Sequence, residues 1–497
     1  MSEVVNSGSN NNFNSRFGAL MSMTGMCVGM GSVWRFPWMV GQYGGGSFII
    51  AYIVCTIIIT LPLAIIECGV GKGLQKGMIG AYSDILHNDK AGHVVGFITS
   101  LGYFTMNFFY YVVLAASTYF IYSSATSEWN RRAPELIYTN YSSNKILISI
   151  ISVILVVATI YVLIKGVSGG IETMSKIMIP LMFLFFIAVI FFGLFCVDNI
   201  SMGYNWYLKP NLEALCNPEI WVAALSQSLF AVGVGPGCIL IYGSHLKKTD
   251  DVTLNMTTVS LLTCSVGIIV GMAMMPACIA MGLDPESGSM LIYVIIPTLL
   301  SRIPFGNIIG ILLFFAILFA GFSSAIAQTE VAASTFATDL KMGRKKASLL
   351  LGAINVVAAV AAVYSTAFYD FWNNFSGNYV FVTTAGLGAI AFVYIYKVER
   401  IRTNFLNVSS DIKLGPWFSK FVTFIAAPLM IIVMANSLIP FIPSGSSFTN
   451  SIREPGLDTS AYVILAVVFV LYGVTCFLLY KCMTVKPHTE LPESANN

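Results

Sequence analysis

The sequence predicts an all-α integral membrane protein with twelve transmembrane helices, and three observations support this fold class. The chain of 497 residues is 57% hydrophobic and only 10% charged, with a mean hydropathy of +0.79. Apolar runs of the length that crosses a bilayer, about 20 residues, recur along nearly all of it. Two of these runs carry glycines and a proline at mid-span, where an uninterrupted helix is not expected.

The apolar runs define the expected spans, which we take in chain order. They lie at residues 16–42, 47–71, 93–125, 146–164, 173–195, 219–243, 252–281, 307–337, 347–366, 375–396, 420–440 and 460–480. An even number of spans puts both termini on one side, and most Lys and Arg residues lie in the segments on that side. This asymmetry predicts cytoplasmic termini in a multi-pass protein of the plasma membrane.

Composition also excludes several classes of function. Basic blocks of the kind that bind nucleic acid are missing, and the sequence offers no pairing of nucleophile and base, no phosphate loop and no metal-ligand spacing, so an enzyme is not expected. No obligate protein partner is evident. Most of the ten cysteines stand singly in apolar runs and read as small core residues. Cys196 and Cys216 flank one outer loop, where a disulfide is one possibility.

The interruptions lie in the first and sixth spans, at Cys27–Pro37 and Leu229–Gly237. Irregular backbone at membrane depth is tolerated only where it is buried in protein or lines a polar cavity. Because each broken span opens a block of five, we expect two five-helix repeats of opposite orientation that face each other at mid-membrane. The expected boundaries are tails at 1–15 and 481–497, repeats at 16–197 and 219–396, and two further helices within 420–480.

Charged residues within the spans are few. Arg35, Glu67, Glu330 and Asp370 lie in or at the ends of apolar runs, where an unpaired charge costs about 3 kcal/mol or more. Arg35 and Asp370 are expected at similar depth near the outside and can pair as an outer gate, or else be two unrelated residues that reach the interface. Glu67 is expected to accept hydrogen bonds from the broken sixth span, although ordinary helix pairing is the alternative.

An unwound helix supplies carbonyl oxygens to a monovalent cation without adding charge. Carbonyls freed between Gly25 and Val28 can meet the hydroxyls of Ser323 and Ser324, with the Ala320 carbonyl one turn earlier on the eighth span. Serine pairs also hold transmembrane helices together, which is the alternative reading.

Several separate motifs in order resemble the neurotransmitter:sodium symporter family, specifically a bacterial member with the LeuT-like fold. They are GMGSVWRFP, YGGGSF, IECGVGKG, FYYVV, KGVSGGIETMSKIMIP, WVAALSQSLF and FAGFSSAIA. The resemblance covers nearly the whole chain. It implies a sodium site, the second of that family, at the Gly25, Val28 and Ala320 carbonyls and the Ser323 and Ser324 hydroxyls.

The resemblance also places the substrate pocket and the gates. It assigns the substrate-binding tyrosine to Tyr111, the aromatic lid to Phe230 and the outer gate to Arg35, Asp370 and these two aromatic residues. The pocket is expected to be lined by Met26, Cys27, Met30, Gly31, Asn107, Tyr111, Phe230, Ala231, Gly233, Pro236, Ser324 and Gln328. The family's cytoplasmic arginine and tryptophan latch is missing, since Asn10 and Phe13 stand there, and its acidic partner falls on Thr338.

Departures from the family pattern concern the other ion sites. The first sodium site falls on Cys27, Ser32, Ala231 and Thr263, where Ala231 has no side-chain oxygen and Ser32 is shorter than the usual amide. Tyr52 and Gln227 match two anion ligands, but the remaining positions are Ala231 and Gly267, with neither the serine of chloride-dependent members nor the glutamate of chloride-independent ones. We therefore expect one sodium ion and no chloride.

These features together predict a symporter that couples sodium entry to uptake of an amino acid from the bilayer's outer side. Gly29 stands where monoamine carriers have an aspartate, so a zwitterion is favoured over a simple amine, and Asn107 and Gln328 favour a polar or larger side chain. Two alternatives stay open. One is a sodium-independent or proton-coupled exchanger of amino acids or amines in which His245 or Glu330 titrates, and the other is a substrate sensor.

Overall fold

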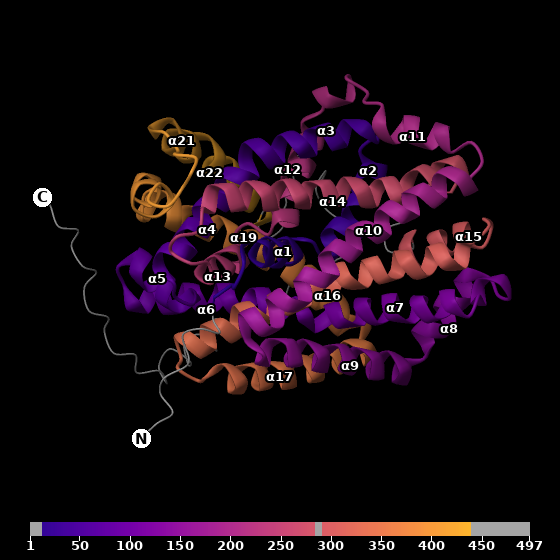
Figure 1. The fold of residues 1–497 in the computed structure, drawn as a ribbon, viewed down its shortest axis with the longest axis horizontal. Coiled ribbons are helices and arrows are strands. Elements are labelled where there is room, and N and C mark those ends of the chain that lie inside the picture. Colours follow the sequence, from indigo (N-terminus) through magenta and orange to yellow (C-terminus); the bar gives the residue numbers. More distant parts are fainter. Residues whose placement is uncertain (1–11, 284–290, 439–497) are drawn as a thin grey trace, which may run out of the picture.

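The structure is a computed structural model that describes residues 12–283 and 291–438, and within these ranges every regular element is a helix. Long helices run side by side, and α1 lies in the middle of them (Figure 1). In the described ranges eight helices are long and apolar enough to cross a membrane, and one bent pair makes a ninth such span. The all-α membrane fold expected from the sequence is confirmed.

The first five spans lie close to their expected positions. They are formed by α1 (Arg16–Cys27) with α2 (Phe36–Gln42), α3 (Gly46–Cys55) with α4 (Leu61–Leu74), α6 (Asp89–Thr105) with α7 (Asn107–Ala125), α9 (Lys145–Ile164), and α10 (Thr173–Cys196) with the π-helical segment Val167–Glu172 before it. Short helices connect them outside the spans: α5 (Met78–Leu86), α8 (Pro134–Ser143) and α11 (Ile200–Leu208).

Further helices occupy the positions expected for the sixth to eleventh spans. They are α12 (Pro218–Val232) with α13 (Cys238–Ser244), α14 (Val252–Ala280), α16 (Gly306–Thr338), α17 (Arg344–Tyr364), α18 (Thr366–Asn374) continuing through α19 (Phe381–Ala389) to Ile395, and α21 (Pro416–Phe421) continuing to α22 (Ala427–Leu438). Two short helices, α15 (Ile296–Leu300) and α20 (Val398–Ile401), lie between them. The expected twelfth span at 460–480, the tail at 481–497 and most of the tail at 1–15 lie outside the described residues.

The first span breaks as its glycines predict. After α1 the backbone turns extended at Val28 (φ −79°, ψ 104°), and a π-helical segment at Gly31–Arg35 leads into α2. The axes of the two halves differ by 61°. Peptide groups between Cys27 and Gly31 therefore leave the regular ladder and are available to other partners.

The sixth span breaks over Gly233–Gly237, between α12 and α13. Gly233, Gly235 and Gly237 have positive φ values of 75°, 108° and 87°, a conformation that glycine adopts without steric cost. The Glu67 carboxylate on α4 accepts a hydrogen bond from the Gly235 N–H at 2.7 Å. It thus satisfies a backbone donor that the break exposes in the buried interior.

α1 is enclosed by other helices and packs against α10, α14 and α16. Gly25 permits this packing, because a Cβ there would lie 3.0 Å from Ile179 and 3.2 Å from the Ser323 Cβ. Cys196 and Cys216 are both free, so the disulfide considered from the sequence is not formed.

Replacing Gly235 by alanine is expected to destabilise the fold by about 2 kcal/mol or more. The new Cβ would lie 2.1 Å from Ala385 Cα on α19, at a φ that L-residues rarely adopt. Gly169→Ala is the matched control, because nothing lies within 4 Å of a Cβ there. Thermal melting of the purified variants measures the difference, and equal melting temperatures would contradict the prediction.

Candidate functional site

Five oxygen atoms from the first break and from α16 come together in the buried centre. The Ser323 hydroxyl donates to the Gly25 carbonyl at 2.8 Å and to the Ala320 carbonyl at 2.9 Å. The Ser324 hydroxyl donates to the Val28 carbonyl at 3.0 Å. Both serines are buried, with 6% and 4% of their surface exposed. The structure therefore brings together every ligand expected for the second sodium site.

The chemistry of this set fits an alkali cation. Carbonyl and hydroxyl oxygens are the ligands that hard cations prefer, and a hydroxyl that donates to a carbonyl can turn its lone pairs towards an ion instead. Each hydroxyl bridges α16 and α1, so an ion at this point would hold the two helices together. The set carries no charge of its own, which favours a monovalent ion over a divalent one.

The tyrosine that contacts the first break is Tyr110, and the sequence-based assignment to Tyr111 is wrong by one residue. The Tyr110 hydroxyl accepts a hydrogen bond from the Met30 N–H at 3.0 Å. A Cβ at Gly29 would lie 3.1 Å from this hydroxyl and 2.5 Å from Ser324 Oγ, so Gly29 leaves the space in which these groups meet. Tyr111, the next residue on α7, faces Thr159 and Thr329 instead.

Asn107, one turn before Tyr111, is displaced from the pocket by the same shift. Its amide donates to the Thr329 hydroxyl at 2.9 Å and to the Ala325 carbonyl at 3.3 Å, both on α16. It therefore joins α7 to α16 and does not pair with Gln328. The Gln328 side-chain carbonyl is buried with no hydrogen-bond partner among the described residues. The Asn107 side-chain carbonyl is likewise buried with no partner there, so each of the two amides keeps one unused oxygen.

The aromatic lid lies directly on the first break. A Cβ at Gly31 would lie 2.3 Å from the Phe230 ring, so only glycine allows this contact. The Phe230 ring packs on Phe381, with ring centres 4.8 Å apart, and the Arg35 guanidinium lies 5.2 Å above its centre. Arg35 also donates to the Ser226 hydroxyl at 3.4 Å. Asp370 lies exposed on α18, and its pairing with Arg35 stays a prediction.

The residues at the positions of the first sodium site offer different chemical groups from those that the family uses there. The Cys27 thiol donates to the Val232 carbonyl at 3.0 Å, and Thr263 lies against the thiol. The Gln227 amide donates to the Gly31 carbonyl at 2.9 Å. Ala231 is buried and supplies no oxygen, while the Ser32 and Thr263 hydroxyls have no hydrogen-bond partner within the described ranges.

The remaining residues expected in the pocket are all buried: Met26, Met30, Gly233, Pro236. Three functional candidates were missed by the sequence analysis, namely Tyr110, Glu172 and Arg344. The motif FYYVV contains two adjacent tyrosines, and composition does not say which one faces the break. Glu172 lies just before α10 and Arg344 begins α17, and charged residues are ordinary at the ends of helices.

These features, two broken helices and an oxygen cage between the first break and α16, define the class of sodium-coupled secondary transporters. A family model described as the sodium:neurotransmitter symporter family matches residues 10–147 and 129–484. The chain belongs to this family, whose members are sodium-coupled transporters and not enzymes.

Individual relatives agree with this assignment. An uncharacterized sodium-dependent transporter of Methanocaldococcus jannaschii is 28% identical over 95% of this chain and 98% of its own length. The sodium-dependent transporter YhdH of Bacillus subtilis is 27% identical over 71% of this chain and 78% of its own. The crystal structure of MhsT in complex with L-phenylalanine shares the fold, with a TM-score of 0.75 and 24% identity over 86% of this chain and 99% of that one.

Substituting Tyr110 by phenylalanine is expected to reduce substrate uptake about tenfold, since the buried Met30 N–H loses its acceptor. Tyr111→Phe is the matched control on the adjacent residue and should change uptake less than twofold. Initial rates of radiolabelled amino-acid uptake in proteoliposomes compare the two. A larger loss for Tyr111→Phe than for Tyr110→Phe would contradict the corrected register.

Proposed function

We propose that the protein imports an amino acid together with one sodium ion, independently of chloride. The observation that carries this proposal is the convergence of the Gly25, Val28 and Ala320 carbonyls with the Ser323 and Ser324 hydroxyls. Sodium bound there would tie α1 to α16. An ion between a broken helix and a continuous one links ion binding to the position of that broken helix, which is what coupling requires.

The use of one ion is supported by the chemistry at the other site. Ala231 offers no oxygen, and the Cys27 thiol is a weak donor directed at the Val232 carbonyl. A cation there would meet a thiol and the two hydroxyls of Ser32 and Thr263 in place of carboxamide oxygens, with no ligand from Ala231. The transfer of a sodium ion from water to such a set is unfavourable.

Independence of chloride is supported by Gly267 and Ala231, which offer no anion ligand. A Cβ at Gly267 would already lie 3.2 Å from the Phe36 ring, so a longer side chain requires that ring to move. If the first sodium site binds no ion, the positive charge that a chloride ion would balance is also missing.

An amino acid is the substrate class that the site favours. Tyr110 and the peptide N–H groups around Gly29 can receive a carboxylate, as the ends of broken helices do. Position 29 is a glycine and not an acidic residue, so an amine without a carboxylate lacks a counterion there. Relatives named for amino acids agree, namely MhsT with its bound L-phenylalanine and the bovine neutral amino acid transporter B(0)AT2, 25% identical over 52% of this chain. Gln328 favours a polar or bulky side chain.

Import would proceed by movement of a four-helix bundle against the remaining helices. The bundle contains the first, second, sixth and seventh spans, and the remaining helices form a scaffold. The Phe230 ring lies against Gly31, where it would act as the outer lid over the break.

A proton-coupled or sodium-independent exchanger is the alternative, and one contact favours it. His245 Nε2 lies 3.2 Å from the Glu330 carboxylate, a pair that can exchange a proton. Uptake driven by a pH gradient in sodium-free vesicles would support the exchanger. Uptake that requires a sodium gradient at constant pH would exclude it.

Sodium is expected to stabilise the purified protein, and Ser323→Ala and Ser324→Ala should abolish this effect. Saturation at one hundred times Kd corresponds to about 2.7 kcal/mol. Ser265→Ala is the matched control, because this exposed serine on α14 donates only to the Leu261 carbonyl of its own helix. Melting temperatures with sodium, with potassium and with choline measure the effect. Equal stabilisation by all three salts would contradict the sodium site.

A further inference from the structure

Four helices of the scaffold, α7, α9, α16 and α17, each pack against the other three and surround a set of buried polar side chains. Asn107 on α7, Thr329 on α16 and Asn355 on α17 are at most 1% exposed. We propose that these helices enclose a bound water molecule between the Asn107 and Asn355 amide oxygens, and that it holds α7 in the rotation that turns Tyr110 to the first break. The proposal goes beyond the transport function, since it depends on neither the substrate nor the coupled ion.

The Thr329 hydroxyl determines how the two amide groups are oriented. It donates its hydrogen to the Ala325 carbonyl of its own helix at 3.1 Å, so it can only accept from other groups. The Asn107 amide donates to it at 2.9 Å and the Asn355 amide at 3.4 Å. The NH2 end of each amide is therefore directed at Thr329. Both Oδ1 atoms are left as acceptors, and neither has a hydrogen-bond partner among the described residues.

Water supplies the donors that these two oxygens need. A buried acceptor left without a donor costs about 1–3 kcal/mol, and buried water in proteins makes about three hydrogen bonds to such groups. One water can donate to both amide oxygens and accept from the Tyr111 hydroxyl, which faces Thr329 from the same side of α7 as Asn107. Two amide oxygens and one hydroxyl are fewer ligands than the five oxygen atoms of the proposed sodium site, so water is favoured over a cation.

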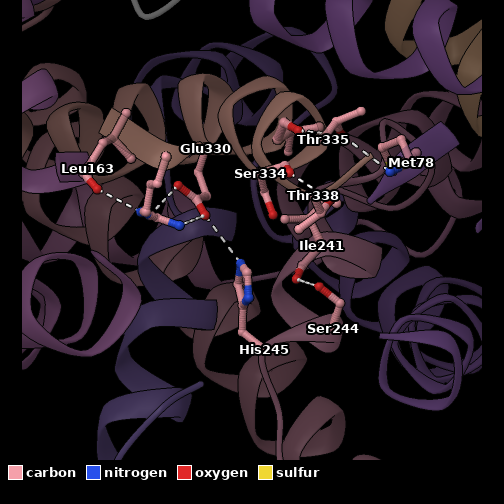
Figure 2. Close-up of polar contacts among 11 residues, drawn as sticks. Met78, Leu163, Ile241, Ser244, His245, Glu330, Ser334, Thr335 and Thr338 are labelled. Atoms are coloured by element: carbon pink, nitrogen blue, oxygen red, sulfur yellow. Dashed lines mark hydrogen bonds and ion pairs between the residues drawn. The ribbon is translucent and has the colours of Figure 1, made fainter. Parts of the chain in front are cut away.

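Three of the four helices are also joined next to this cluster by an ion pair (Figure 2). Arg344 at the start of α17 pairs with both carboxylate oxygens of Glu330 on α16, at 3.0 and 2.7 Å. Its Nε–H donates to the Leu163 carbonyl on α9 at 2.8 Å. α7 takes no part in this ion pair and is joined to α16 through Asn107. A water between the two amide oxygens would connect α7 to α17 as well.

The rotation of α7 decides where Tyr110 points. Asn107 is the first residue of α7, because the helix before it ends at Thr105. Asn107 and Tyr111 are four residues apart and lie on one side of α7, whereas Tyr110 is turned by about 100° from Tyr111. With that side held in the cluster, Tyr110 faces the first break and accepts from the Met30 N–H at 3.0 Å. A rotation of α7 away from the cluster would withdraw this acceptor.

Crystal structures of the unmodified protein test the ligand, and no variant has to fold for this. We expect a peak of electron density within hydrogen-bond distance of both amide oxygens, at a resolution that shows ordered water. Crystals grown with thallium in place of sodium should show no anomalous signal at this peak. A thallium signal between the amides would identify a cation and overturn the proposal, and so would the lack of any density there. The proposed sodium site is judged separately, by the signal beside Ser323 and Ser324.

Asn355→Leu tests the effect on Tyr110, because it keeps a similar branched shape and removes the amide oxygen. Uptake of a mixture of radiolabelled amino acids is expected to fall about tenfold, as in Tyr110→Phe. The double variant should take up no less than Tyr110→Phe alone, since both changes act through one hydroxyl. Tyr111→Phe leaves both amide oxygens to hold the water, which agrees with the small effect expected of it above.

Thr118→Val is the matched control on α7, because the Thr118 hydroxyl donates to the Leu114 carbonyl of its own helix at 3.0 Å. It should leave uptake unchanged. A crystal structure of Asn355→Leu adds a measurement that does not depend on transport, and in it the Tyr110 hydroxyl should lie beyond hydrogen-bond distance of the Met30 N–H. Independent, multiplying effects of Asn355→Leu and Tyr110→Phe on uptake, or an unchanged Tyr110 contact in that crystal structure, would overturn the positioning of Tyr110.

Discussion

The structure depends on one constraint, which is that peptide groups released within a membrane must find partners inside the protein. Each break frees N–H and C=O groups that in hydrocarbon would cost several kcal/mol apiece. The first break directs its carbonyls to Ser323 and Ser324 and the Met30 N–H to Tyr110. The second directs the Gly235 N–H to Glu67. The partners of the first break come from α7 and α16, so the same contacts that stabilise the irregular backbone also bring together the oxygen atoms of the proposed sodium site.

Close approach of helices is the second requirement, and glycine supplies it at a few points. Gly25 lets α1 reach α16, Gly29 leaves space for Tyr110 and Ser324, and Gly31 accepts the face of Phe230. At each point a methyl group would occupy the space that a polar or aromatic side chain fills. These glycines therefore determine how closely the neighbouring side chains approach the first break, although they contribute no functional group.

Much of this arrangement follows from sequence, because its signals are strong ones. Long apolar runs predict spans, and glycines at mid-span predict breaks, as in Gly233–Gly237. The Ser323 and Ser324 ligands follow from their spacing after Ala320. What failed was the register of α7, where Tyr110 and Tyr111 differ by about 100° around one helix and only tertiary packing decides which faces the break. Glu172 and Arg344 were missed for a related reason. Their partners Ser15 and Glu330 are 157 and 14 residues away in the chain, and no local sequence pattern predicts these contacts.

Buried charge away from the breaks is compensated in a similar way. A buried carboxylate costs desolvation unless a cation and hydrogen-bond donors compensate it. Lys176 on α10 balances Glu172 and Arg344 on α17 balances Glu330, while Asn14, Ser15 and His245 contact the same two carboxylates. Because each carboxylate already has a counterion, the contacts from Asn14, Ser15 and His245 are not required to neutralise it, and they join the start of α1 and the end of α13 to groups whose charge is balanced.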